Sequence, residues 1–276
     1  MLSVSAGLRF FRFVVPALML LPCLAAGQAP SEVGKAWADL ANSRPRNVLR
    51  ALDGKLTSRE ARLAWATALM SDQPATDGNM RRAEEILADL AKGRDEIAAE
   101  AAYLCGRLNQ LYYTKPDYAK AAEIYRTLAG RQPQSHWAQL GLVKLGMLEM
   151  YAPAGGTAIP SDRLAPAEAL LARIHEPLLQ RDLNLQIGLA GIVLKQPLRR
   201  LIPHLVAADR IGEFSSQSRE DLIVQIGELS LRAGLLAQAR EYFERYQREY
   251  PIERRSYVVQ VRLNEVNARL KAEAGR

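Results

Sequence analysis

Apolar residues recur every three or four positions along the chain from residue 31 to the end. This is the period of the α-helix, and no segment shows the alternation that is typical of a β-strand. Pro, Gly, Asn and Asp interrupt the pattern at short intervals and so divide it into separate helices. The expected helices span residues 31–42, 45–52, 58–71, 79–92, 95–113, 117–131, 135–151, 165–175, 180–195, 198–211, 218–233, 236–250 and 252–274. The sequence therefore predicts an all-α fold.

Hydroxyl side chains mark the starts of two of these helices. Ser58 and Ser218 each precede acidic residues, and this combination satisfies the unpaired amides of a helix N-terminus. We expect both serines to be N-caps.

One sequence pattern occurs in two of the expected helices, 117–131 and 236–250. An aromatic residue or Leu is followed by Ala three positions later, by an aromatic residue seven later and by Pro fifteen later. The two copies are Tyr118, Ala121, Tyr125 and Pro133, and Leu236, Ala239, Phe243 and Pro251. The Ala lets two helices approach closely, the aromatic ring fills the gap one turn on, and the Pro ends the helix.

Three of the expected helices carry parts of a second motif, Trp-x-x-Leu-Gly-x-x-Tyr. The matching residues are Trp137, Leu140 and Gly141 in one helix, Gly227 in another, and Leu108 and Tyr112 in a third. Lys144 replaces the aromatic residue in the first helix, and Asn109 occupies the glycine position in the third. With these two motifs the chain resembles the tetratricopeptide repeat, a helix-turn-helix unit of about 34 residues.

The resemblance implies a right-handed α-solenoid of stacked antiparallel helix pairs, in which each unit buries its apolar face against its neighbours. Clean units lie near residues 101–133 and 219–251, and the spacing between Ala121 and Ala239 is not a whole multiple of the repeat. We expect an N-terminal helical segment at 28–57 and a repeat domain at 58–276. About five pairs and a polar C-terminal capping helix would make up the array.

The resemblance also assigns roles to particular residues. Proteins of this family bind another protein or a peptide in the concave groove that their first helices line. The implied groove positions are Tyr103, Gln110, Tyr113, Ala138, Leu142, Val224, Glu228 and Arg232. The residues that the resemblance implies to pack between helices are Leu108, Tyr112, Tyr118, Ala121, Tyr125, Pro133, Trp137, Leu140, Gly141, Gly227, Ala239, Phe243 and Pro251.

The first 27 residues have the order of a secretory signal peptide. Arg9 and Arg12 precede an apolar run at 13–26, and small residues follow at the end of this run. Cleavage after Gly27 would leave Gln28 as the new N-terminus. The protein is therefore expected to be exported, to the periplasm or the cell envelope.

Two alternatives for this segment remain open. If it is retained as an anchor, residues 13–26 contact the membrane, although Pro16 and Pro22 interrupt a run shorter than the ~20 residues that usually span a bilayer. The other alternative is lipid attached to Cys23, but Pro22 stands where a small residue is expected. Cleavage would leave Cys105 as the only cysteine, which we expect to be buried.

Charge and chemistry exclude several classes of function. Lys and Arg total 37 against 30 Asp and Glu, a formal net charge of +7, but no more than two basic residues adjoin, which indicates a solvated surface rather than a nucleic-acid site. The three histidines, His136, His175 and His204, are far apart in the chain and form no metal-binding pair. Acidic pairs such as Glu84 and Glu85 are interpreted as exposed helix faces. We therefore expect no catalytic residues, no metal and no cofactor.

Three hypotheses follow for the function. The first is a non-catalytic exported scaffold that binds a protein or peptide in the concave groove and serves in envelope assembly or secretion. The second is a membrane-tethered component of an envelope assembly complex. The third is a superhelical enzyme that acts on the cell wall, which would need a catalytic domain for which no residues remain. The sequence does not identify the partner.

Overall fold

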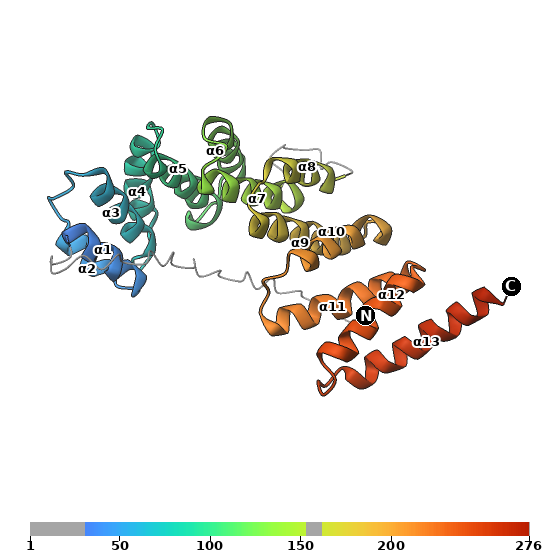
Figure 1. Cartoon of the computed structure of the whole chain (residues 1–276). Coiled ribbons are helices and arrows are strands. Elements are labelled where there is room, and N and C mark those ends of the chain that lie inside the picture. Colours follow the sequence, from blue (N-terminus) through green and yellow to red (C-terminus); the bar gives the residue numbers. More distant parts are fainter. Residues whose placement is uncertain (1–30, 153–161, 276) are drawn as a thin grey trace, which may run out of the picture.

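The computed structural model describes residues 31–152 and 162–275, and this part of the chain is helical with no strand. Its helices are α1 (Glu32–Ala41), α2 (Pro45–Ala51), α3 (Arg59–Ser71), α4 (Asp77–Leu90), α5 (Glu96–Arg107), α6 (Tyr118–Arg131), α7 (His136–Tyr151), α8 (Leu164–Leu170), α9 (Pro177–Val193), α10 (Leu198–Ile211), α11 (Ser216–Arg232), α12 (Leu236–Glu249) and α13 (Ser256–Ala274) (Figure 1). A π-helical turn, Leu108–Tyr112, continues α5, and a 3-10 turn, Leu171–Arg173, continues α8. The all-α prediction is confirmed, and each expected helix is present.

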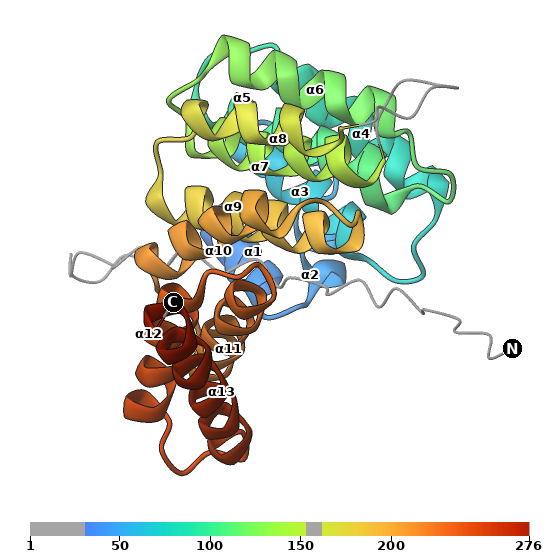
Figure 2. The same cartoon turned by 90° about the vertical axis from the view of Figure 1, so that its right-hand side faces the viewer.

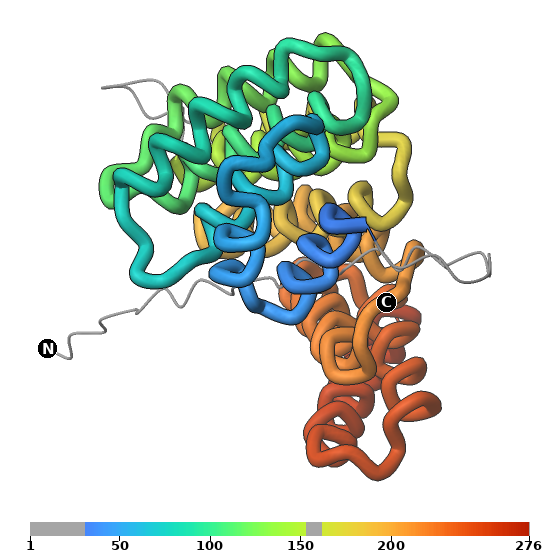
Figure 3. The backbone as a smooth tube through the Cα atoms, turned by 90° about the vertical axis from the view of Figure 1, so that its left-hand side faces the viewer, coloured from blue at the N-terminus to red at the C-terminus, as the bar shows by residue number. Residues whose placement is uncertain are grey.

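The helices pack in the order of the sequence. Each helix contacts the next one along the chain, and from α1 to α9 each odd-numbered helix also contacts the next odd-numbered helix. In Figure 1, α6 and α8 lie on the outside of a curved stack, whereas α5, α7 and α9 lie on its inside. The helices α11, α12 and α13 project from one end (Figure 2), and α1 and α2 lie against α3 at the other (Figure 3). This arrangement is consistent with an α-solenoid.

Three hydrophobic clusters run along the stack. The first joins α1 to α5, the second joins α5 to α10, and the third joins α10 to α13. Two adjacent residues of α10 belong to different clusters: Leu201 faces the second and Ile202 the third. Each part of the stack therefore buries its apolar residues only against its neighbours, as expected of a repeat architecture.

Two glycines on odd-numbered helices allow close contact with aromatic rings of the helices that follow. A Cβ added at Gly227 of α11 would lie 2.5 Å from the Phe243 ring, and one added at Gly106 of α5 would lie 2.3 Å from the Tyr125 ring. Asn109, which stands at the glycine position of the motif, lies in the π-helical turn, and the glycine against the Tyr125 ring is Gly106, one turn earlier. The Asn109 side chain is directed toward α4, where its Nδ2 lies 2.7 Å from a Glu84 oxygen.

The structure corrects the details of three helix starts. Ser58 caps α3 as expected, because its hydroxyl accepts a hydrogen bond from the Ala61 amide at 3.1 Å. The cap of α11 is Ser215 rather than Ser218, which is itself bonded to Ser215. The last helix begins at Ser256 rather than at residue 252, and α9 begins three residues earlier than expected, with Pro at its first position.

The last helix, α13, is not the polar cap that was expected. Its inner side packs against α12 through residues such as Val259 and Val266. Its outer side exposes Tyr257 (79%), Val258 (55%) and Val261 (47%), and Ile252 in the preceding turn is 94% exposed. The first turns of α13 therefore expose apolar side chains, and the charged residues of this helix begin only at Arg262.

None of the helices in the described ranges combines the length and the apolar character needed to cross a membrane. The expected signal peptide at residues 1–27, with Cys23 and the apolar run 13–26, lies outside the described residues, as does the loop at 153–161.

Candidate functional site

Four of the expected groove positions lie inside the protein. Tyr103, Gln110, Ala138 and Leu142 are each at most 8% exposed. Tyr103 stacks against Tyr125 and Trp137, with ring centroids 6.0 and 5.4 Å apart. These four assignments are wrong as surface contacts, because the side chains belong to the core between neighbouring helices.

The other four expected positions are at least partly accessible, but they do not form one surface. Tyr113 is half-buried, and its hydroxyl donates a hydrogen bond to Glu84. Val224 packs on the third hydrophobic cluster, and Glu228 accepts a hydrogen bond from Arg262 at 2.9 Å. Arg232 is exposed in the last turn of α11. Three of the four positions therefore lie on α11, at the projecting end of the stack.

A different set of residues on α5, α7 and α9 is partly accessible and recurs at helical spacing. We call this set the odd-helix face. It consists of Glu100, Leu104 and Arg107 on α5, Leu140, Lys144, Met147 and Tyr151 on α7, and Leu178, Asp182, Leu185 and Leu189 on α9. Intervals of three and four place the members from each helix on one side of that helix. Of the expected groove positions, Tyr103, Ala138 and Leu142 are one or two residues away from members of this face.

Charge is concentrated in the middle of the odd-helix face. Burial, and then the positive charge of Arg107, lowers the pKa of Lys144 to about 8, and Asp182 only partly offsets this effect. Among the described residues neither Arg107 nor Lys144 has an ion-pair or side-chain hydrogen-bond partner, since Asp182 pairs with Arg181 at 2.7 Å. Two cations thus share apolar surroundings with no carboxylate bound to either. Burial, and then the charge of Glu96, raises the pKa of Glu100 on the same face to about 7.

The expected repeat-packing positions divide into two groups. Leu108, Ala121, Tyr125, Gly141, Gly227, Ala239 and Phe243 are buried, and Trp137 and Leu140 are half-buried. Pro133 and Pro251 are exposed and follow the ends of α6 and α12 by two residues. Tyr112 and Tyr118, at 39% and 41% exposure, are wrong as packing residues, because Tyr112 ends the π-helical turn and Tyr118 is the first residue of α6, and both reach the surface.

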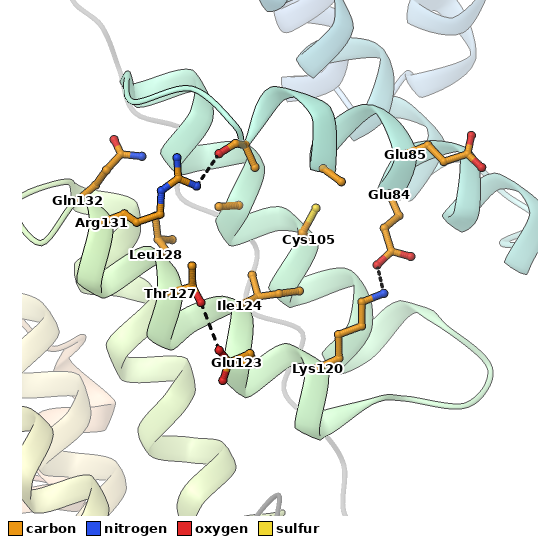
Figure 4. Close-up of a pocket in the computed structure, with 13 residues that line it drawn as sticks. Glu84, Glu85, Cys105, Lys120, Glu123, Ile124, Thr127, Leu128, Arg131 and Gln132 are labelled. Carbon is orange, nitrogen blue, oxygen red and sulfur yellow. Dashed lines mark hydrogen bonds and ion pairs between the residues drawn. The ribbon is translucent and has the colours of Figure 1, made fainter.

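A separate hollow lies between α4 and α6, with α5 as its floor (Figure 4). We call it the outer trough, because α4 and α6 are even-numbered helices on the other side of the stack from the odd-helix face. Its volume is about 540 Å³. Apolar residues form most of its inner surface, including Ala102 and Cys105 of α5 and Ile124 of α6. Cys105 is buried as expected, and burial raises the pKa of its thiol to about 12.

Glu84 forms the polar end of the outer trough and joins three segments of the chain. It accepts hydrogen bonds from Asn109 Nδ2 at 2.7 Å, from the Tyr113 hydroxyl at 2.6 Å and from Lys120 Nζ at 2.7 Å. Burial opposes ionisation of Glu84, but the hydrogen bonds from Lys120, Tyr113 and Asn109 together outweigh it and lower the pKa. The expectation that Glu84 is a solvated surface residue is therefore wrong.

Two of the three histidines, His204 and His136, make side-chain contacts with other segments of the chain. His204 lies 2.8 Å from Asn184 and 3.3 Å from Glu168, and His136 lies 2.7 Å from Glu176. Within residues 31–152 and 162–275, no group of three or more His, Cys, Asp and Glu side chains could hold a metal ion.

No protein-family model matches this chain, and a search of curated proteins found no match to its sequence. The function must therefore be inferred from the odd-helix face, the outer trough and the packing of the helices.

Proposed function

We propose that this protein is a non-catalytic interaction scaffold that binds a protein or peptide along the odd-helix face. The observation that carries the proposal is the combination of accessible leucines with Arg107 and Lys144, neither of which has an ion-pair partner among the described residues. Apolar side chains supply contact area, and desolvated cations supply specificity for a partner of opposite charge. The sign of the charge in the middle of the face favours an acidic group in the partner.

We further propose that the stack is a right-handed solenoid of tetratricopeptide-like units. In this interpretation α3 to α12 make five pairs, α13 is the terminal helix, and α1 and α2 form the N-terminal helical segment. The contacts between successive helices and the rings of Tyr125 and Phe243 against glycines support this interpretation. A surface that runs across several units suits an extended or helical segment of a partner.

We also propose that the protein is exported after loss of residues 1–27 and acts in the periplasm or the cell envelope. The order of basic, apolar and small residues in this segment supports the proposal. The N-terminal residue of the purified protein tests it. Gln28 at the N-terminus is the expected result, whereas a retained segment or lipid on Cys23 would indicate tethering to the membrane.

Capture of partners from envelope extracts tests the scaffold. Leu178 of the odd-helix face is 47% exposed, and Val258 of α13 is 55% exposed, so both positions accept Arg without disturbing the core. We expect Leu178→Arg to lose a specific partner that the native protein and Val258→Arg both retain, as identified by mass spectrometry. Identical captures by all three proteins would refute the role of this face. Tyr113→Ala is a poor probe, because it also removes a hydrogen bond to Glu84.

A further inference from the structure

The outer trough has the size and lining of a small-molecule site. Its volume of about 540 Å³ lies within the ~300–1,000 Å³ typical of ligand pockets. Alanines at 88, 91 and 102 leave the space open, because larger side chains there would fill the gap between α4 and α6. Ile124 and Leu128 of α6 supply the opposite wall. An apolar ligand would thus contact protein on several sides.

Both ends of the outer trough are closed by side chains of α6 (Figure 4). At one end, Lys120 pairs with Glu84 at 2.7 Å. At the other, Arg131 donates hydrogen bonds to the backbone carbonyls of Ala91, Lys92 and Gly93 at 3.0–3.1 Å. Lys120 and Arg131 are separated by about three turns of helix, or roughly 16 Å. The trough therefore suits a ligand of limited length and blocks a peptide that continues past either end.

The two ends differ in charge. Lys120 is neutralised by Glu84, whereas Arg131 is bonded to neutral carbonyls and pairs with no carboxylate among the described residues. The remaining rim carboxylates do not compensate for it, since Glu85 points away from the hollow (Figure 4) and the Glu123 side chain is 74% exposed. One end of an apolar trough thus carries a positive charge that bonds to backbone carbonyls and has no carboxylate partner among the described residues.

We propose that the outer trough binds a free fatty acid, with its chain along α6 and its carboxylate beside Arg131. The chain would cover Ala88, Ala102 and Ile124, and the carboxylate would approach Arg131, which has no carboxylate partner among the described residues. Burial of each further methylene raises affinity about fourfold, so affinity should increase with chain length until the roughly 16 Å of the trough is filled. This proposal does not depend on the partner of the odd-helix face.

Calorimetric titration of the purified protein with fatty acids of eight to fourteen carbons, below their micelle concentrations, tests the proposal. We expect a rise of about fourfold per carbon followed by a plateau. Ala88→Leu, at an exposed position of α4, should weaken dodecanoate binding at least tenfold, because the new side chain enters the trough. Ala237→Leu, the same change at an exposed position of α12, should bind as the native protein does. Circular dichroism of both variants checks that they are folded.

The head group is tested by comparing dodecanoate with dodecanol. The native protein and Arg131→Lys should prefer the acid, and Arg131→Gln should lose this preference while it still binds the alcohol. Equal native affinities for acid and alcohol would overturn the placement of the carboxylate. An affinity that does not depend on chain length, or that Ala88→Leu does not change, would overturn the outer trough as the binding site. If no fatty acid binds, the proposal is also overturned. The hollow would then be a place for the side chains of a protein partner.

Discussion

Substitution of Gly106 by Ala tests the packing between α5 and α6. The new Cβ would lie 2.3, 2.7 and 2.9 Å from three carbons of the Tyr125 ring. This ring is fully buried, and its hydroxyl donates a hydrogen bond to the Gln110 side chain at 3.0 Å, so it has little freedom to move. A single methyl group therefore forces the two helices apart or displaces the ring.

The expected change in the free energy of unfolding has two opposing parts. Replacement of Gly by Ala in the interior of a helix stabilises the folded state by about 1 kcal/mol. Overpacking in a dense core costs about 1–3 kcal/mol, and the short distances to the Tyr125 ring place Gly106 at the upper end of this range. We therefore expect Gly106→Ala to destabilise the protein by about 2 kcal/mol in net terms.

Gly130 provides the matched control within α6. A Cβ added there has no atom within 4 Å, so only the gain in helix propensity remains, about 1 kcal/mol of stabilisation. Thermal unfolding followed by circular dichroism should separate the two variants by about 6–12 °C, since 1 kcal/mol shifts Tm by about 2–4 °C in a chain of this size.

A double substitution identifies the cause of the effect. In a Tyr125→Leu background the ring is absent, and Gly106→Ala should lose most of its cost, which gives a coupling energy of at least about 1 kcal/mol. If Gly106→Ala instead stabilises the native protein as Gly130→Ala does, the close contact between α5 and α6 is refuted.

Two further predictions concern charged groups. Glu84→Gln should destabilise the protein by about 1–2 kcal/mol at pH 7, because it replaces a carboxylate that accepts three hydrogen bonds. The pKa of Glu84 in the folded protein is lowered from 4.5, so the stabilisation by the carboxylate is present above pH 4.5 and fades as the pH falls through the folded pKa. In thermal melts between pH 7 and 3, the difference in Tm between the native protein and Glu84→Gln should therefore shrink. A difference in Tm that stays constant over this range would contradict the prediction. Lys144→Met should raise Tm at pH 7, because burial and Arg107 disfavour the charged amine. Since the folded pKa of Lys144 is about 8 and its ordinary value is 10.5, the native protein should gain stability relative to the variant between those pH values. Parallel melting curves across that range would argue against a desolvated Lys144.

Local pattern was sufficient to predict the helices, because each one combines a helical period with a nearby breaker. The ends of α6 and α12, two residues before Pro133 and Pro251, are examples. The π-helical turn at Leu108–Tyr112 could not be predicted in this way. It brings Asn109 to Glu84 of α4, 25 residues away in the chain, and no local signal marks a contact of that separation.

The odd-helix face shows why the accessible side of a helix can be predicted wrongly even when the fold is predicted correctly. Leu104, Leu140 and Met147 are apolar, as are the core residues beside them, so helical periodicity identifies one broad apolar stripe on each helix without separating its buried and accessible parts. Only the contacts with the preceding and following helices decide which part is covered.

The charged residues within the stripe supply the missing information. Arg107 and Lys144 interrupt the apolar pattern at positions where a core would exclude an unpaired cation, and solvent or a partner must therefore reach them. In a stack of this kind, an unneutralised charge within an apolar stripe is a better guide to the accessible face than an aromatic residue, because aromatic residues such as Tyr103 also fill the core.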